Sequence, residues 1–356
     1  MSFLGFLVRL RLVDILQKAL DKIVCEYAQE ADGDEALEAL EEALKNSYIE
    51  ILASTPIKVL DSIKKAAADG GLEERRNLHK GFVERNYTRW KEGFDSLEVL
   101  IEICSEAGES NAQRLGSNEL IHDNRYGALM RLHAKGCLVA REIFCLLLNG
   151  FADGAHARWR ALHELSVTAM FLGRCDEGTV EKYFLHECVE SYKGALMHRK
   201  YEDRLQAKGV NDEELAELKA LHDSVVEKYG QDFKNSYGWA EAFLNKKRVN
   251  FLDIEEYVGL DHWRPYYKWA SQNIHATAKT LTCSLGMVEA KEEGLLAGPS
   301  NSGLTDPAHS MAISLVQLTT VLLSVDPNLD DLVSMNMIKT LIDEIGDAFL
   351  RGAGLA

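Results

Sequence analysis

Two apolar segments joined by a four-residue link constrain the fold of this chain more than any other feature. Residues 126–148 read YGALMRLHAKGCLVAREIFCLLL, and a second apolar segment covers about residues 154–172. Apolar residues at steps of three and four predict a helix in each segment. Asn149-Gly150 is a common C-terminal helix signal. Because the link runs only from Asn149 to Ala152, we expect the two helices to form an antiparallel pair.

Helix signals extend through the rest of the chain. Leu37, Leu40, Leu44, Tyr48 and Ile51 recur at helical spacing behind an acidic first turn. Further helices are expected from residue 177 to about 198, over 211–229 and from near residue 265. Another is expected between the Asp-Pro pairs at 306–307 and 326–327, with Asp306 as its N-cap and Pro307 as its first residue. No segment alternates apolar and polar residues with a period of two. The sequence therefore predicts an all-α, multi-helix bundle with long antiparallel helices and no significant sheet.

The predicted organisation has three parts: an N-terminal helical region (1–75), a helical core (76–325) and a C-terminal helix (326–356). Asp69-Gly70-Gly71 marks a break between the first two. The loop over residues 294–310 is rich in Gly, Ser, Asn and Pro. We interpret it as a connection between helices, with a functional loop as the alternative.

Charge and cysteine usage restrict the class of protein. A net charge of −16 over 356 residues disfavours a protein whose main task is to coat nucleic acid. The seven cysteines include no CxxC pair, the first residues lack a cleavage-like site, and no apolar run is long enough to span a bilayer. We therefore expect a cytoplasmic protein with no membrane contact. Between His122 and Arg174, however, seven basic residues face only four acidic ones, which favours an anionic ligand there.

Several stretches together resemble one bacterial family of unknown function, DUF5677. The hallmark is GFADGAHARWRALHE, from residue 150 onward. The others are RWKEGFDSLEVLIEICSEAGE (89–109), KYFLHECVESYK (182–193), YGWAEAFL (237–244), DHWRPYYKWASQNIHA (261–276) and LLAGPSNSGLTDP (295–307). The resemblance covers roughly residues 80–325. It implies a fold neighbourhood and no particular chemistry, because the family has no settled activity.

Within the hallmark, Arg158 and His163 have the spacing Arg-x4-His, which is similar to the catalytic signature of HEPN ribonucleases. The resemblance implies metal-independent cleavage of RNA by a homodimer, with 2′,3′-cyclic phosphate products. A histidine would accept the proton of a ribose 2′-hydroxyl, and an arginine would stabilise charge on the phosphate. The chain departs from the signature at Trp159, where a polar residue is usual.

Helical geometry leaves the identity of the arginine open. Residues 158 and 163 lie about 140° apart on a straight helix, whereas Arg160 shares a face with His156, His163 and Glu164. The same residues also fit a purely structural network, in which Arg160 pairs with Glu164 and with Glu142 or Glu190 on neighbouring helices. Catalysis and structure both remain open on the sequence alone.

Other candidates support this site or form separate ones. His156 and Glu164 are expected beside Arg160, and His186 and Glu190 lie on the next helix. Ser271 and His275 align on the helix after Pro265. Three further candidates belong to the 294–310 loop: Ser300, Asn301 and Asp306. No metal-ligand spacing is present, so we expect no metal and no cofactor.

The sequence supports two functional hypotheses. The first is a metal-independent endoribonuclease of the HEPN kind, a toxin or phage-defence effector, with a basic His/Arg pocket for RNA or a nucleotide phosphate. The alternative is a non-enzymatic helical interaction module, a scaffold or regulatory partner, that binds a protein through residues 1–70. Whether the protein is an enzyme is left open by the sequence.

Overall fold

A computed structural model describes residues 18, 21, 22, 25, 34–115, 123–275, 277–292 and 294–355. All regular elements among these residues are helices, as predicted for an all-α protein. None of the described helices is both long and apolar enough to cross a membrane. The chain divides into two compact units, residues 1–81 and 82–356. The start of the sequence, MSFLGFLVRLRLVDIL, in which no cleavage-like site was found, lies outside the range that the structure describes in full, and nothing tests that expectation.

In the first unit, α3 (Asp34–Ala66) leads into a short π-helix (Ala67–Gly71), after which α4 (Leu72–Leu115) begins. Asp69 and Gly70 leave helical geometry, and Gly70 has a φ of 102°. Glycine adopts this left-handed region without steric cost. The Asp-Gly-Gly sequence therefore interrupts the helix where the sequence predicted a break.

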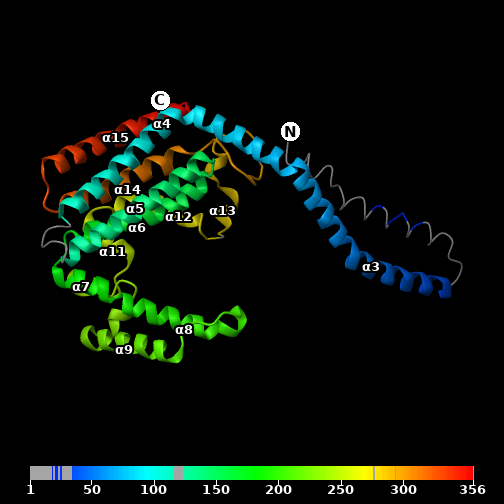
Figure 1. Cartoon of the computed structure of the whole chain (residues 1–356), viewed down its shortest axis with the longest axis horizontal. Helices are drawn as coiled ribbons and strands as arrows, with labels where there is room; N and C mark the ends of the chain where they lie inside the picture. Colours follow the sequence, from blue (N-terminus) through cyan, green and yellow to red (C-terminus); the bar gives the residue numbers. More distant parts are fainter. Residues whose placement is uncertain are drawn as a thin grey trace. The chain divides into compact units, whose positions relative to one another are not determined.

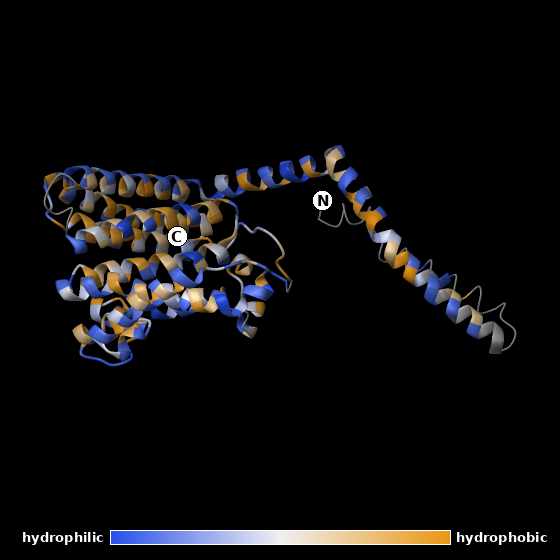
Figure 2. Ribbon diagram, turned by 60° about the horizontal axis from the view of Figure 1, so that its bottom comes forward, coloured by the Kyte–Doolittle hydropathy of each residue, from blue (hydrophilic) through white to orange (hydrophobic). Residues whose placement is uncertain are grey.

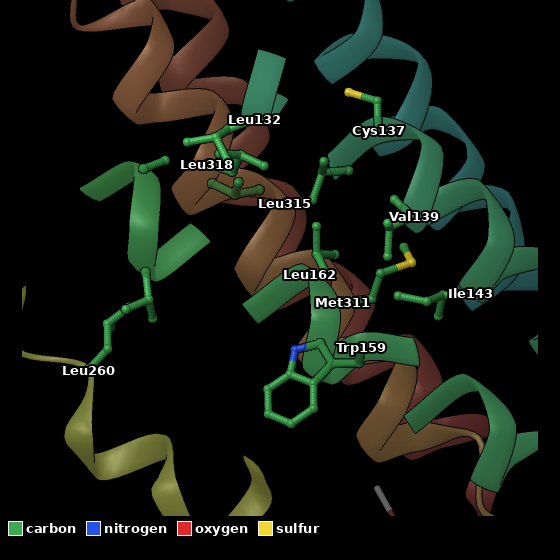
Figure 3. Packing of buried hydrophobic residues seen from close by; sticks show 14 of the residues in the cluster. Leu132, Cys137, Val139, Ile143, Trp159, Leu162, Leu260, Met311, Leu315 and Leu318 are labelled. Atoms are coloured by element: carbon green, nitrogen blue, oxygen red, sulfur yellow. The ribbon is translucent and has the colours of Figure 1, made fainter. Parts of the chain in front are cut away.

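The core of the second unit is built on α5 (Asn124–Leu148), α6 (Ala152–Leu172), α14 (Thr305–Leu323) and α15 (Leu329–Ala353). α5, α6 and α14 pack against one another, and α15 packs on α14 (Figure 1). The short link between α5 and α6 makes them the expected antiparallel pair. Side chains of α5, α6 and α14 meet in the interior (Figure 3). Val139, Trp159 and Leu315, one from each helix, are fully buried.

Aromatic contacts attach α4 to this core. Phe94 of α4 packs edge-on against Phe144 of α5 and Phe349 of α15, with ring centroids 6.0 and 5.7 Å apart. Trp90 lies 5.5 Å from Phe349 and donates a hydrogen bond to the Asn301 carbonyl. The helices of this unit carry hydrophilic and hydrophobic residues along their lengths (Figure 2), as expected for amphipathic helices.

Shorter helices complete the second unit. They are α7 (Glu177–Leu185), α8 (Glu187–Leu205), α9 (Asp212–Tyr229), α10 (Glu241–Leu244), α11 (Phe251–Val258), α12 (Arg264–Gln272) and α13 (Ala278–Thr282), with 3-10 turns at Gln231–Lys234, Asp261–Trp263 and Leu285–Met287. α8 packs on α9, and both α11 and α12 pack on α6. Pro265 lies in the first turn of α12, as predicted.

Two predicted helix boundaries were wrong. The single helix expected from residue 177 to about 198 is divided at His186, whose imidazole bonds to the Asn235 carbonyl and packs on Phe233. Asp306 is not the N-cap of α14, because the helix begins at Thr305 and Pro307 lies inside its first turn. Proline is tolerated there because first-turn N–H groups need no helical partner.

The structure predicts a large difference between two glycine-to-alanine substitutions. Gly303 has a φ of 73°, and a Cβ there would lie 2.1 Å from the Leu285 carbonyl oxygen. We expect Gly303→Ala to destabilise the protein by more than ~2 kcal/mol. In contrast, Gly194→Ala in α8, where a Cβ meets nothing within 4 Å, should stabilise by about 0.5–1 kcal/mol. Urea denaturation followed by circular dichroism measures both; equal effects would contradict the loop geometry.

Candidate functional site

A buried polar network on α6, α11 and α12 contains several of the predicted site residues. His163 of α6 donates from Nε2 to Glu255 Oε1 of α11 over 3.0 Å. The other carboxylate oxygen of Glu255 accepts from Arg264 of α12 over 2.6 Å. The exposed side-chain fraction is 1% for His163 and 0% for Glu255. An ionised carboxylate without solvent needs such partners, so these three residues join three helices.

A second ion pair lies beside the first and closer to solvent. Arg160 pairs with Glu164 one turn later over 3.1 Å, as the i,i+4 spacing predicted. The Tyr267 hydroxyl donates to Glu164, and the guanidinium carbons of Arg160 and Arg264 lie 4.8 and 4.9 Å from the Tyr267 ring centre. Burial and the Glu164 carboxylate raise the pKa of Tyr267 well above its usual range. The hydroxyl therefore remains a hydrogen-bond donor.

His156 lies one turn before Arg160 in an apolar environment. Its side chain is fully buried, stacks on Trp159 at 5.4 Å, and lies edge-on to Trp269 at 5.2 Å. Neither ring nitrogen has a hydrogen-bond partner among the described residues. Burial lowers the pKa of His156 to about 4. This ring is therefore neutral at pH 7 and acts as an aromatic packing residue.

The structure does not bring Arg158 to His163. Arg158 points to α5 and pairs with Glu142, whereas His163 points to α11. The expected 140° separation on the helix explains this difference. Glu142 therefore pairs with Arg158, and not with Arg160 as the structural alternative predicted. An Arg-x4-His catalytic pair would require both side chains at one solvent-accessible point, and this arrangement does not provide it.

The remaining predicted candidates lie apart from this network. His186 is buried against the Asn235 carbonyl, and Glu190 pairs with Lys193 over 3.0 Å on the surface of α8. Ser271 donates to the Tyr267 carbonyl within α12, and His275 is exposed. No three ligand-type side chains among the described residues are grouped to hold a metal ion.

The three loop candidates have structural contacts. Ser300 N donates to the Gly150 carbonyl over 2.9 Å, and the Asn301 carbonyl accepts from Arg89 over 2.9 Å. Asp306 is half-buried in the first turn of α14, where desolvation raises its pKa. These contacts hold the loop against α4 and the α5–α6 link. They agree with its interpretation as a connection.

A separate cavity of about 530 Å³ lies where α5, α6, α14 and α15 meet. Arg125, Arg174 and Lys339 line it together with Gln317, Thr320, Ser324 and Asn336 and with the apolar side chains of Leu129, Met170, Val316, Val321, Val325 and Met335. No acidic residue is among the lining residues. Arg125 and Arg174 come from opposite ends of the basic segment that the sequence revealed. Lys339 lies 165 residues beyond Arg174 and had no sequence signal.

The charges around this cavity leave a positive balance. Arg125 pairs with the exposed Glu177 over 3.2 Å and also donates to the last carbonyl of α6. Arg174 donates to the Val258 carbonyl, and within the described part of the chain neither Arg174 nor Lys339 has a carboxylate partner. The C-termini of α6 and α14 contribute about half a negative charge each and the N-terminus of α5 about half a positive one. Three cations therefore outweigh the local negative charge by roughly one and a half units.

Stability measurements distinguish the buried pair from the exposed one. Arg264→Met removes the cation that neutralises Glu255 and should cost about 3–5 kcal/mol. Arg158→Ala removes an ion pair whose side chains are 34% and 42% exposed, and should cost less than about 1 kcal/mol. Urea denaturation at pH 7 measures both values. A small loss in Arg264→Met would show that the buried Glu255 carboxylate does not depend on Arg264.

A pH dependence follows from His156. Its folded-state pKa lies below the ordinary value, so protonation favours the unfolded chain. The resulting stability is complete above about pH 6.5 and decreases by about 3 kcal/mol as the pH falls to about 4. His156→Phe removes this loss. The stability of the variant relative to wild type should therefore increase as the pH falls from 7 to 4. The exposed His262→Phe is the control. Parallel pH profiles for wild type and His156→Phe would contradict the assignment.

The segment of this chain that matches a known family contains this network and part of the cavity lining. Residues 126–293 match DUF5677, a family of unknown function. The matched range contains α6, α11 and α12 in full, whereas Arg125 and Lys339 lie outside it. Comparisons with curated proteins and with solved structures gave no match. The match over residues 126–293 confirms the resemblance to the DUF5677 family that the sequence predicted.

Proposed function

We propose that this protein binds a phosphate-bearing ligand, a nucleotide or the end of an RNA, in the cavity between α5, α6, α14 and α15. The observation that carries the proposal is the lining itself: three cationic residues and no acidic one, in a chain with a net charge of −16. Its volume of about 530 Å³ lies within the ~300–1,000 Å³ range of ligand sites. Arginine and lysine are the usual phosphate ligands.

The lining also suits the other part of a nucleotide. Met170, Val316 and Val321 offer an apolar surface to a base. The side-chain amides of Gln317 and Asn336 also line the cavity. Since one nucleotide has both an apolar face and an anionic end, an amphipathic cavity favours it over inorganic phosphate alone.

RNA cleavage by Arg158 and His163 remains the sharper hypothesis from the sequence, but the geometry gives it less support. His163 is buried and bonded to Glu255, and Arg158 is paired elsewhere. We therefore place the function in binding rather than in this pair. The interaction-module hypothesis is favoured by a different observation, the exposed apolar side chains of α3, including Ile49 and Leu52.

Binding is tested with AMP, adenosine and a short 5′-phosphorylated RNA, by calorimetry with the full chain. AMP or the RNA should bind, and adenosine should bind at least tenfold more weakly. Arg174→Ala and Lys339→Ala should each weaken binding about tenfold, which corresponds to ~1.4 kcal/mol, and raised salt should weaken wild-type binding. The control is Lys268→Ala on the exposed side of α12. Equal affinity for adenosine and AMP, or unchanged affinity in both pocket variants, would overturn the proposal.

The same samples test cleavage. Incubation of the RNA with wild-type protein should give no 2′,3′-cyclic phosphate ends. If wild type produced such ends and Arg158→Ala abolished them at unchanged stability, the ribonuclease hypothesis would replace the binding proposal.

A further inference from the structure

The middle of α3 exposes a continuous apolar stripe. Ile49, Leu52, Ile57 and Leu60 have exposed fractions of 65%, 58%, 63% and 49%. The exposed Pro56 lies between them. Spacings of seven and four residues place Ile49, Pro56 and Leu60 along one line of the helix, and Leu52 and Ile57 lie on either side of it, so that the five side chains form one broad face. A stripe of large apolar side chains in water marks an interaction surface.

Charge is divided between the two ends of the same helix. Residues 34–50 contain six acidic residues and one basic residue, whereas residues 51–66 contain three basic residues and one acidic residue. Glu38 and Glu42 are exposed before the stripe, and Lys64 and Lys65 are exposed after it. The stripe therefore lies between an acidic end and a basic end of one helix.

We propose that α3 pairs antiparallel with α3 of a second copy of this chain. An antiparallel pair places the acidic end of each helix against the basic end of the other, twice, around a twofold axis through the apolar stripe. A parallel pair would place like charges opposite each other. Such a contact is isologous, so one surface is complementary to itself and the assembly closes as a dimer. The proposal goes beyond the phosphate-bearing ligand and does not depend on it.

The apolar stripe and the charged ends of α3 have different roles in this pairing. Burial of the four large apolar side chains supplies the affinity, because removing apolar surface from water is the main favourable contribution to association. Exposed ion pairs contribute far less, because water and salt screen them. The charged ends therefore determine the direction of pairing, and the stripe determines whether pairing occurs.

The oligomeric state of the full chain tests the stripe. Light scattering after size exclusion should give the mass of a dimer for wild type at micromolar concentration. Leu52→Glu combined with Ile57→Glu should give a monomer with an unchanged helical signal, since both side chains are exposed. The matched control, Leu281→Glu with Val288→Glu, changes two equally exposed apolar residues elsewhere, at 76% and 61%, and should remain dimeric.

A charge exchange tests the direction. Lys64→Glu with Lys65→Glu should weaken the dimer at least tenfold, and addition of Glu38→Lys with Glu42→Lys should restore it. A wild-type dimer that persists in the Leu52→Glu/Ile57→Glu variant would overturn the proposal. A monomeric wild type would also overturn it. In that case a lower melting temperature of this variant would assign the stripe to a contact within the chain, and an unchanged one to a different protein partner. A dimer that the charge exchange does not affect would overturn the antiparallel arrangement.

Discussion

The carboxylate of Glu255 is the constraint on which the second unit's polar interior depends. A fully buried negative charge is unfavourable by several kcal/mol unless its partners are fixed in place. Here the partners are His163 on α6 and Arg264 on α12, so one side chain determines how three helices meet. Tyr267 then occupies the space between Arg160 and Arg264. The polar residues inside the apolar hallmark of this family segment are thus explained by helix packing.

Local signals were sufficient for much of the fold. The α5–α6 pair, the break at Gly70 and the start of α9 were all predicted, because periodicity, glycine and the Asn211 capping box act over a few residues. The division at His186 was not predicted, because it accompanies a contact with Asn235, 49 residues away. A single sequence contains no signal for that distance.

The candidate site shows the same limit. The Arg160–Glu164 pair followed from helical spacing, whereas Glu255 and Arg264 are separated from His163 by about a hundred residues and were missed. Arg264 lies within a quoted motif, DHWRPYYKWASQNIHA, but nothing in that motif indicates its partner. Counting charges along the sequence also does not show which basic residues of segment 122–174 are neutralised in the fold. Arg141 pairs with Glu102, and Arg158 pairs with Glu142.

This distribution of charge favours the proposed binding over the catalytic hypothesis. A catalytic pair must share a point that substrate can reach, and the cations in the middle of α6 are already paired with carboxylates. Where α6 ends, Arg174 donates to a backbone carbonyl and to no carboxylate of the described residues, and Lys339 of α15 lines the same cavity. A hydrogen bond to a carbonyl oxygen does not neutralise the positive charge of a guanidinium. An anion therefore gains more at the end of α6 than at its centre, although the centre contains the residues that resemble an active site.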